Sequence, residues 1–261
     1  MSFKDSKGSG KLERIVAAIK ESSREILGRK LIYWQKRDLS MVSNIDIAIQ
    51  DAITGIILHN YSHDRIICEE RGAPDSESKS AFTWIIDPID GTDNFIHGKN
   101  EYGISVGLME GGRFIEALLL FPGLGESYYA GRGRGIWKDE VLFQPAVCAE
   151  YGGRREIILC SKTYESKRHI FESSGHVVKC YRCATYSLLR LLKGEASMYH
   201  VSNTMIYDVG PMSFVLELAG IPVLDDKGGY LQFSASRNII PFVMALSDIS
   251  MKEETYKLFC M

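Results

Sequence analysis

A short apolar run that leads directly into two aspartates is the strongest structural constraint in this sequence. Residues 82–86 read FTWII, an aromatic and β-branched run typical of a buried strand, and Asp87 and Pro88 follow at once. Pro88 lacks an N–H and disfavours helix in the residue before it, so we expect Asp87 and Asp90 on a tight bend. The Gly-Thr pair after Asp90 predicts the start of a short helix, whose free N–H groups can bind phosphate.

The spacing of apolar residues along the rest of the chain predicts a layered α/β protein. Apolar positions recur at helical spacing over residues 12–28 and again from Asp46 onward. The first half, about residues 1–138, otherwise shows strands and hairpin turns, whereas about 139–261 alternates strands with helices. We expect one continuous domain over residues 1–261. The further expected strands are 66–68, 104–109, 114–121, 127–130, 136–138, 156–160, 177–180, 221–224 and 239–246, and the further expected helices are 184–193, 208–219 and 249–259.

The composition excludes several classes of partner. A net charge of −2, from 31 Lys+Arg and 33 Asp+Glu, argues against a nucleic-acid arm or a polybasic membrane patch. Residues 1–11 are polar, and no later apolar run approaches the roughly 20 residues of a membrane span. We therefore expect a cytoplasmic protein whose six cysteines are reduced thiols. Cys180 and Cys183 form a lone CxxC, for which two partly buried thiols are favoured over a zinc or redox site.

Two further acidic residues stand beside predicted elements. Glu69 follows a short strand, and Asp208 stands at the start of a predicted helix. Taken alone, Glu69 is explained as a solvated surface acid and Asp208 as a helix N-cap. An N-cap role also explains Asp90, but it leaves Asp87 without a role. The question is therefore whether these acids converge.

Converging carboxylates would need cations. Each pair of charges ~4 Å apart repels by about 1 kcal/mol in bulk water, and by several times more near a protein surface. Ligands that are all oxygen, with no His or Cys, suit Mg²⁺ best and Mn²⁺ second, whereas Zn²⁺ fits poorly. A converging set of these acids therefore predicts a magnesium site.

Six segments of the chain, in order, resemble motifs of the inositol monophosphatase family of Mg²⁺-dependent, lithium-sensitive phosphatases. Residues 87–95 (DPIDGTDNF) resemble its first signature, which is highly specific, and residues 207–220 resemble the second. The matches extend over roughly residues 36 to 250. The resemblance implies an αβαβα sandwich of the sugar-phosphatase type, a phosphoric monoester hydrolase and a homodimer. The remaining matches are residues 38–46, 67–70, 130–135 and 226–229.

The resemblance also implies a set of metal ligands. Glu69, Asp87 and the backbone carbonyl of Ile89 would hold the first metal ion. Asp87, Asp90 and Asp208 would hold the second, so that Asp87 bridges the two. The cofactor would be Mg²⁺, two or three ions per site, with Mn²⁺ as a possible substitute.

Further roles in the reaction follow from the same resemblance. Glu69 and Thr92 would position the attacking water, and Asp46 would orient Thr92 from behind. Asp90 belongs to the same catalytic set, and the main-chain N–H groups of Gly91 and Thr92 would bind phosphate oxygens.

Several positions depart from the family pattern. Asp93 adds an acid close to the phosphate site, and Arg182 and Cys183 stand where the family often has Gly-Ser. The sugar-contacting glutamate of the family falls on Val201, which cannot accept a hydrogen bond from an inositol hydroxyl. These departures leave the phosphate monoester itself open.

The second signature also differs in composition. Tyr207 replaces the usual Trp, and Gly210 and Pro211 replace Ala-Ala or Ala-Gly. We expect Pro211 in the first turn of the helix that starts at Asp208, where its missing N–H costs little.

The sequence thus predicts a Mg²⁺-dependent phosphomonoesterase acting on an inositol phosphate or a related sugar phosphate. Uncatalysed phosphate-monoester hydrolysis is so slow that paired metal ions are an appropriate catalyst. Water would attack directly, since no Ser, Cys or His stands where a covalent nucleophile is expected. Two alternatives remain: a phosphatase for 3′-phosphoadenosine-type nucleotides, and a regulatory or scaffold protein with a vestigial site.

Overall fold

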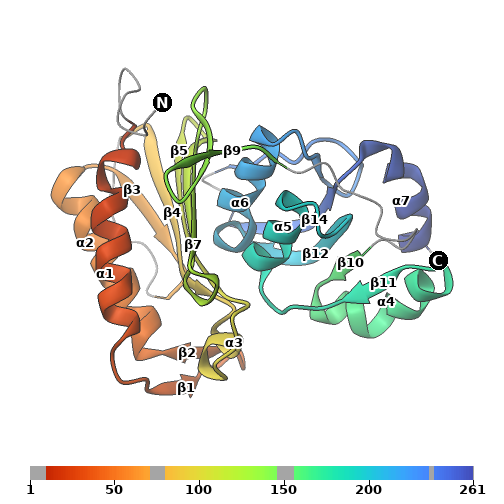
Figure 1. Cartoon of the computed structure of the whole chain (residues 1–261), viewed down its shortest axis with the longest axis horizontal. Coiled ribbons are helices and arrows are strands. Elements are labelled where there is room, and N and C mark those ends of the chain that lie inside the picture. The colour runs from red at the N-terminus through yellow and green to blue at the C-terminus, as the bar shows by residue number, and fades with distance from the viewer. Residues whose placement is uncertain (1–9, 71–79, 146–155, 235–237, 261) are drawn as a thin grey trace.

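Alternating layers of helices and sheets make up the computed structural model of this chain (Figure 1). The structure describes residues 10–70, 80–145, 156–234 and 238–260, so most of the polar opening segment and Cys148 lie outside it. Two large sheets stand on either side of a central helical layer, and further helices cover their outer faces. This is the layered α/β protein that the sequence predicts, in the αβαβα arrangement that the family resemblance implies.

The first sheet has seven strands in the order of the chain. Its first two strands are parallel, and every later pair is antiparallel. The parallel pair places the carboxyl ends of two strands side by side, and these ends carry the acidic motifs. The strands are β3 (Arg65–Cys68), β4 (Phe82–Asp90), β5 (Gly103–Glu110), β6 (Arg113–Phe121), β7 (Glu126–Gly131), β8 (Gly135–Lys138) and β9 (Val141–Phe143).

The second sheet has five strands in the order β11-β10-β12-β14-β13. β10 is parallel to both of its neighbours, and the remaining pairs are antiparallel. A separate hairpin joins the first two strands of the chain. The strands are β10 (Glu156–Leu159), β11 (Val177–Lys179), β12 (Met198–Met205), β13 (Val223–Leu224) and β14 (Ile239–Leu246), and the hairpin strands are β1 (Tyr33–Gln35) and β2 (Met41–Ser43).

Apolar packing joins the layers. Neighbouring residues of β4 pack on opposite faces: Ile85 belongs to the core cluster with the central helices, and Ile86 to the cluster with the outer ones. A strand buried on both faces reads as a continuous apolar run, as residues 82–86 do. The outer helices are α1 (Val16–Leu27) and α2 (Asn44–Asn60) on the first sheet, and α4 (Ser161–Ser173) and α7 (Lys252–Cys260) on the second. The central helices are α5 (Ala184–Leu192) and α6 (Ile206–Leu218). The short helix α3 (Thr92–Ile96) follows β4.

β4 corrects one expectation from the sequence. The strand does not stop at Asp87 but continues through Pro88 to Asp90. Asp87 pairs with Ser105 and Asp90 with Gly103, so one extra residue bulges out of β4 at this point. A bulge leaves the extra residue outside the ladder, which is how a strand accommodates a proline. The bulge also sets the direction in which the side chains of Asp87 and Asp90 leave the strand.

α6 corrects a second expectation. It begins at Ile206, two residues before Asp208, so Pro211 lies inside the helix and the expected first-turn position was wrong. The helix starts early because the Asp208 carboxylate accepts a hydrogen bond from the Met205 backbone N–H (2.9 Å) in a capping box. Pro211 contacts β5, where a Cβ added at Gly107 would lie 2.9 Å from its Cγ.

The glycine that replaces alanine in the second signature has a packing reason. A Cβ at Gly210 would lie 2.6 Å from Cζ of Phe114, and one at Gly107 would lie 2.6 Å from Cε1 of the same ring. Phe114 is only 3% exposed and stacks on Phe214 with ring centroids 6.4 Å apart. The two glycines therefore make the space that this ring fills between sheet and helix.

Gly210→Ala should lower the free energy of unfolding by about 1–3 kcal/mol, because the new methyl group overpacks a filled core. Gly55→Ala is the matched control: Gly55 is also helical, and nothing lies within 4 Å of a Cβ built there. This control should gain about 0.5–1 kcal/mol from helix propensity alone. Urea unfolding measures both, and equal stabilisation of the two variants would contradict the packing argument.

Candidate active site

Four acidic side chains reach the same end of the first sheet. Asp87 and Asp90 come from the end of β4, and Glu69 follows β3 directly. Cys68 pairs with Ile86 in the parallel ladder, which puts Glu69 beside Asp87. Asp208 joins them from the first turn of α6 in the central layer (Figure 1).

Asp87 is the least satisfied polar group of this site. Its side chain is 1% exposed, and neither carboxylate oxygen has a hydrogen-bond partner. Burial raises its pKa well above the ordinary value, and the negative charges of Glu69, Asp90 and Asp208 raise the pKa further. Buried polar groups are normally paired, so this carboxylate requires either a proton or a cation.

Asp90 is held by the N-terminus of α5. Its Oδ2 accepts hydrogen bonds from the Thr185 N–H (2.5 Å) and the Thr185 hydroxyl (2.8 Å), and the Cys183 thiol lies 3.3 Å away. Burial nevertheless raises the pKa of Asp90, although these bonds oppose the rise. Sequence reasoning missed Thr185, which contacts Asp90 across 95 positions of the chain. Cys180 and Cys183 are both free thiols.

Asp208 is held in a similar way within its own helix start. Its Oδ2 accepts hydrogen bonds from the Thr204 hydroxyl (2.7 Å) and the Met205 N–H (2.9 Å). Burial, and then the charge of Asp90, raise the pKa of Asp208 to about 7.

Asp46 and Thr92 contact each other behind the acids. Asp46 is fully buried and forms a capping box with Ser43 at the start of α2. The Thr92 hydroxyl lies 2.9 Å from Asp46 Oδ1 and 3.0 Å from the Ile89 carbonyl oxygen, and it can donate to one of them at a time. Burial raises the pKa of Asp46. If another partner binds the Ile89 carbonyl oxygen, the Thr92 hydroxyl donates its hydrogen bond to Asp46.

Gly91 forms the turn into α3. Its φ of +86° is left-handed, and it takes the N-cap position that the sequence analysis considered for Asp90. A Cβ here would lie 3.0 Å from both Cys183 Cβ and the Glu101 carbonyl oxygen. Only glycine fits this turn without strain, and its backbone stays open to a ligand.

Lys36 is a site residue that sequence reasoning missed. Its Nζ lies 3.0 Å from Glu69 Oε1 and 2.8 Å from Glu70 Oε1, from the end of the β1–β2 hairpin. Burial and the charge of Glu69 raise the pKa of Glu70 to about 7. No local sequence pattern identifies Lys36 as a site residue, because its contact with Glu69 spans 33 positions of the chain.

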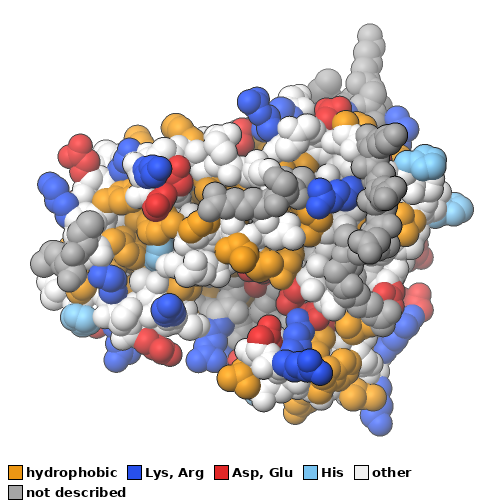
Figure 2. All heavy atoms as spheres, turned by 180° about the vertical axis from the view of Figure 1, so that it is seen from behind, with side chains coloured by type: hydrophobic (Ala, Val, Ile, Leu, Met, Phe, Trp, Pro, Cys, Tyr) orange, Lys and Arg blue, Asp and Glu red, His pale blue; other side chains and the backbone are white. Residues whose placement is uncertain are grey.

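The hairpin that carries Lys36 has an apolar outer surface. Ile32 is 56% exposed, Tyr33 54%, Trp34 47% and Leu39 74%. Hydrophobic side chains gather at the lower end of the molecule in Figure 2, where this hairpin lies.

The charges of the four acids act on one another, but their side chains are not arranged as a complete set of metal ligands. Among the described residues, no group of three or more His, Cys, Asp or Glu side chains could hold a metal ion as arranged. Glu69 faces Lys36, while Asp90 and Asp208 each give an oxygen to protein donors. The donor chemistry still fits a hard cation, because the set is all oxygen and Asp87 has no partner.

Two positions that depart from the family pattern contact each other. Arg182 Nη1 lies 3.7 Å from Asp93 Oδ2, beside the first turn of α3. Val201, in contrast, is 9% exposed and packs in the central core, so it offers no polar atom to a ligand.

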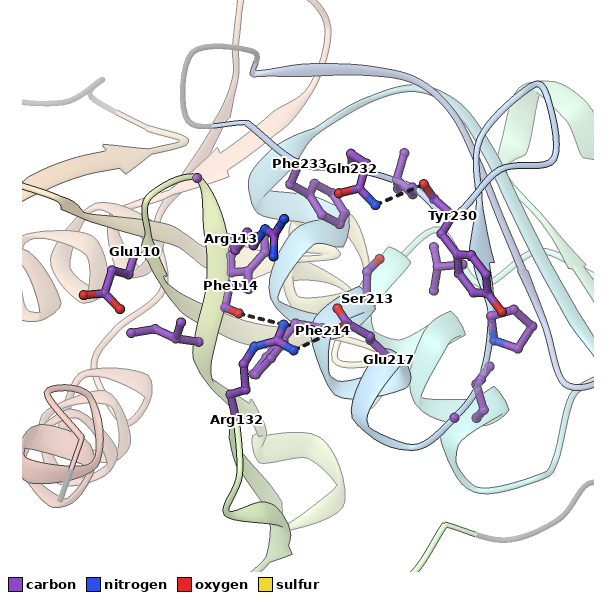
Figure 3. A pocket seen from close by; sticks show the side chains of 17 residues that line it. Glu110, Arg113, Phe114, Arg132, Ser213, Phe214, Glu217, Tyr230, Gln232 and Phe233 are labelled. Atoms are coloured by element: carbon purple, nitrogen blue, oxygen red, sulfur yellow. Dashed lines mark hydrogen bonds and ion pairs between the residues drawn. The ribbon is translucent and has the colours of Figure 1, made fainter. Parts of the chain in front are cut away.

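A cavity of about 720 Å³ lies apart from these acids (Figure 3). The start of β6, the C-terminal half of α6 and residues 230–233 line it, and Arg132 pairs with Glu217 at 3.1 Å on one side. It contains none of the residues that the sequence predicts for the site.

Comparison with known proteins shows a family match over most of the chain. Residues 11–255 match the model of the inositol monophosphatase family. A segment of 94 residues is 38% identical to the putative Nus factor SuhB of Neisseria meningitidis, so the chain spans about a third (36%) of that relative. Human inositol monophosphatase 2 is 26% identical over 209 residues, 76% of this chain and 72% of the relative. A crystal structure of IMPase/NADP phosphatase complexed with Mg²⁺ and phosphate superposes with a TM-score of 0.81 at 18% identity, over 94% and 93% of the chains, and confirms the fold.

The raised pKa values predict how pH acts on the metal-free protein. Asp208 and Glu70 both have a folded-state pKa of about 7, above that of the unfolded chain, so protonation stabilises the fold. This stabilisation is complete at low pH and is lost as the pH rises through 7. In chelator, Tm should fall by about 3 °C or more between pH 5 and pH 8, the shift that roughly 1 kcal/mol produces. Asp208→Asn should reduce the fall, and a flat or rising Tm would contradict the assignment.

Thr185→Ala should weaken Mg²⁺ binding about fivefold to tenfold, because Asp90 loses a hydroxyl donor and becomes free to turn. Thr185→Ser keeps the hydroxyl and is the matched control. Titration calorimetry measures the affinity, and equal binding by both variants would show that the hydroxyl does not orient Asp90.

Proposed function

Because this chain belongs to the inositol monophosphatase family, we propose that it is a Mg²⁺-dependent phosphomonoesterase acting on an inositol phosphate or a related sugar phosphate. The observation that carries this proposal is the unpartnered Asp87 carboxylate, buried among Glu69, Asp90 and Asp208. Such a group is costly in a purely structural role, and it is the group that a bound cation would satisfy.

The ligands divide into two sets. Glu69, Asp87 and the Ile89 carbonyl would hold one Mg²⁺ ion, and Asp87, Asp90 and Asp208 would hold the other. Bound Mg²⁺ supplies an acidified water, charge neutralisation of the phosphate and stabilisation of the leaving alkoxide. To bind the ion, Glu69 would have to give up its contact with Lys36. A third Mg²⁺ ion and substitution by Mn²⁺ belong to the same proposal.

The chain's own groups orient the reaction. Thr92 and Glu69 position the attacking water, and Asp46 fixes the Thr92 hydroxyl through the 2.9 Å contact. The N–H groups of Gly91 and Thr92, at the start of α3, hold the phosphate oxygens.

The attack is by water rather than by a protein nucleophile. The Cys183 thiol is buried against Asp90, and burial raises its pKa well above the ordinary value. A thiol that stays protonated is a poor nucleophile. The scaffold alternative is not favoured, since it requires a vestigial site and all four acids are retained. The nucleotide alternative is not favoured either, since the family model that matches residues 11–255 is that of inositol monophosphatases.

The remaining expectations belong to this proposal. Among the described residues, no helix is long and apolar enough to cross a membrane. From the family alone we further propose a cytoplasmic homodimer that is inhibited by lithium and binds neither nucleic acid nor membrane.

Asp90→Asn and Asp208→Asn should each lower Mg²⁺-dependent phosphate release by at least about a hundredfold. This loss is larger than the one expected for a residue that only orients a metal ligand. Both variants should remain folded, because removal of one charge relieves repulsion among the acids. A panel of inositol, sugar and nucleotide monophosphates measures turnover, with circular dichroism for the fold. Glu254→Gln, at an exposed acid of α7 on the second sheet and outside every family motif, is the control.

If no ester in the panel gives Mg²⁺-dependent release above the level of the two variants, the enzymatic proposal is wrong. Turnover that is equally fast in chelator would contradict the metal assignment while leaving a phosphatase.

A further inference from the structure

Arg182 combines an unfavourable backbone with an exposed charge. Its φ is +55°, in the left-handed region that glycine adopts freely and other residues adopt at a cost in free energy. Strained residues of this kind persist where the surroundings impose them, and they are concentrated at functional sites. A glycine would fit the turn better, so the arginine side chain needs a reason of its own.

The turn that carries Arg182 is bound tightly to the acidic site. On one side, the Cys183 thiol lies 3.3 Å from Asp90 Oδ2. On the other, the Tyr181 carbonyl oxygen accepts a hydrogen bond from the Asn94 side chain in α3 (2.8 Å). Arg182 is therefore held beside both an expected metal ligand and the helix that would bind phosphate.

The guanidinium group itself is only loosely engaged. Its ion pair with Asp93 has an N–O distance of 3.7 Å, and the side chains are 60% and 41% exposed. Ion pairs of this kind contribute little stability. Within the described part of the chain no other ion pair or hydrogen bond of this side chain is found, and Asp93 also lies 3.6 Å from His97. The guanidinium can exchange Asp93 for a better anion at little cost.

An anion near this site needs such a cation. Mg²⁺ ions bound at Glu69, Asp87, Asp90 and Asp208 would offset the charge of these acids, which leaves no excess positive charge there for a second negative group on a substrate besides the phosphate that is being cleaved. Arginine binds carboxylate and phosphate through two parallel hydrogen bonds, which a neutral hydroxyl does not match.

We propose that Arg182 selects phosphate monoesters whose leaving group carries a second anion, a carboxylate or another phosphate. The proposal rests on the proposed phosphatase function and narrows its substrate class. Polyol phosphates without a second charge would be the poorer substrates.

Two matched pairs of substrates test this. 2-Phosphoglycerate and glycerol 2-phosphate differ only in a carboxylate against a hydroxymethyl group, and so do 3-phosphoglycerate and glycerol 3-phosphate. The wild type should show kcat/KM at least about tenfold higher for the carboxylate member, the effect of one charge-assisted hydrogen bond. Binding of each pair is measured in parallel by titration calorimetry with Mg²⁺.

The variants separate a substrate contact from a structural role. Arg182→Gln should remove most of the tenfold preference, Arg182→Lys should retain part of it, and Asp93→Asn should increase it by freeing the guanidinium. Arg182→Gly should lose the preference yet keep or raise Tm, because glycine fits the φ of +55°. Arg29→Gln, at an exposed arginine that follows α1, should keep the wild-type preference.

The outcomes are distinguishable. Equal kcat/KM and equal binding within each pair, or a preference unchanged in Arg182→Gln, would overturn the assignment of Arg182 while the phosphatase function stands. Absence of all Mg²⁺-dependent turnover would overturn the phosphatase function, and the binding preference would still decide the role of Arg182.

Discussion

Mutual repulsion among carboxylates is the constraint on which this molecule depends. Asp87 ends a strand that is buried on both faces, has no hydrogen-bond donor and lies among three other acids. The surroundings reduce the cost in different ways: Thr185 at the start of α5 donates to Asp90, Thr204 and Met205 at the end of β12 donate to Asp208, and Lys36 pairs with Glu69. The central helical layer thus does more than fill the space between two sheets, because its helix starts hold the acids in place.

The sequence predicted this site best where local chemistry dictates the residue type. Proline and glycine in residues 87–92 left few conformations open, and only the continuation of β4 as a bulge was missed. The β1–β2 hairpin was missed because its strands are short and all three residues of the first are exposed, so no alternation of buried and exposed side chains marks it. α4 was missed because its sequence is mostly polar, with only Thr163 and Phe171 buried. Lys36 and Thr185 reach the acids only through tertiary contacts, which no local pattern contains.

The departures from the family pattern are explained better as pairs than singly. Gly210 provides the space for Phe114, so the change in the second signature belongs to a change in packing against β6. Arg182 and Asp93 likewise contact each other beside α3. The first pair is a tight packing contact, whereas the second is an exposed ion pair with an N–O distance of 3.7 Å. The replacement of Trp by Tyr207 has no structural explanation in these contacts.

The position of Asp208 on α6 has a kinetic consequence. Three of the acids lie within residues 69–90, but the fourth arrives only when α6 packs between the two sheets. We infer that the complete site forms late in folding, because it requires contacts that span more than a hundred positions of the chain. A cation that binds all four acids stabilises the native state more than the folding transition state. It should act mainly by slowing unfolding, so bound metal would lengthen the lifetime of the folded chain more than it would hasten its formation.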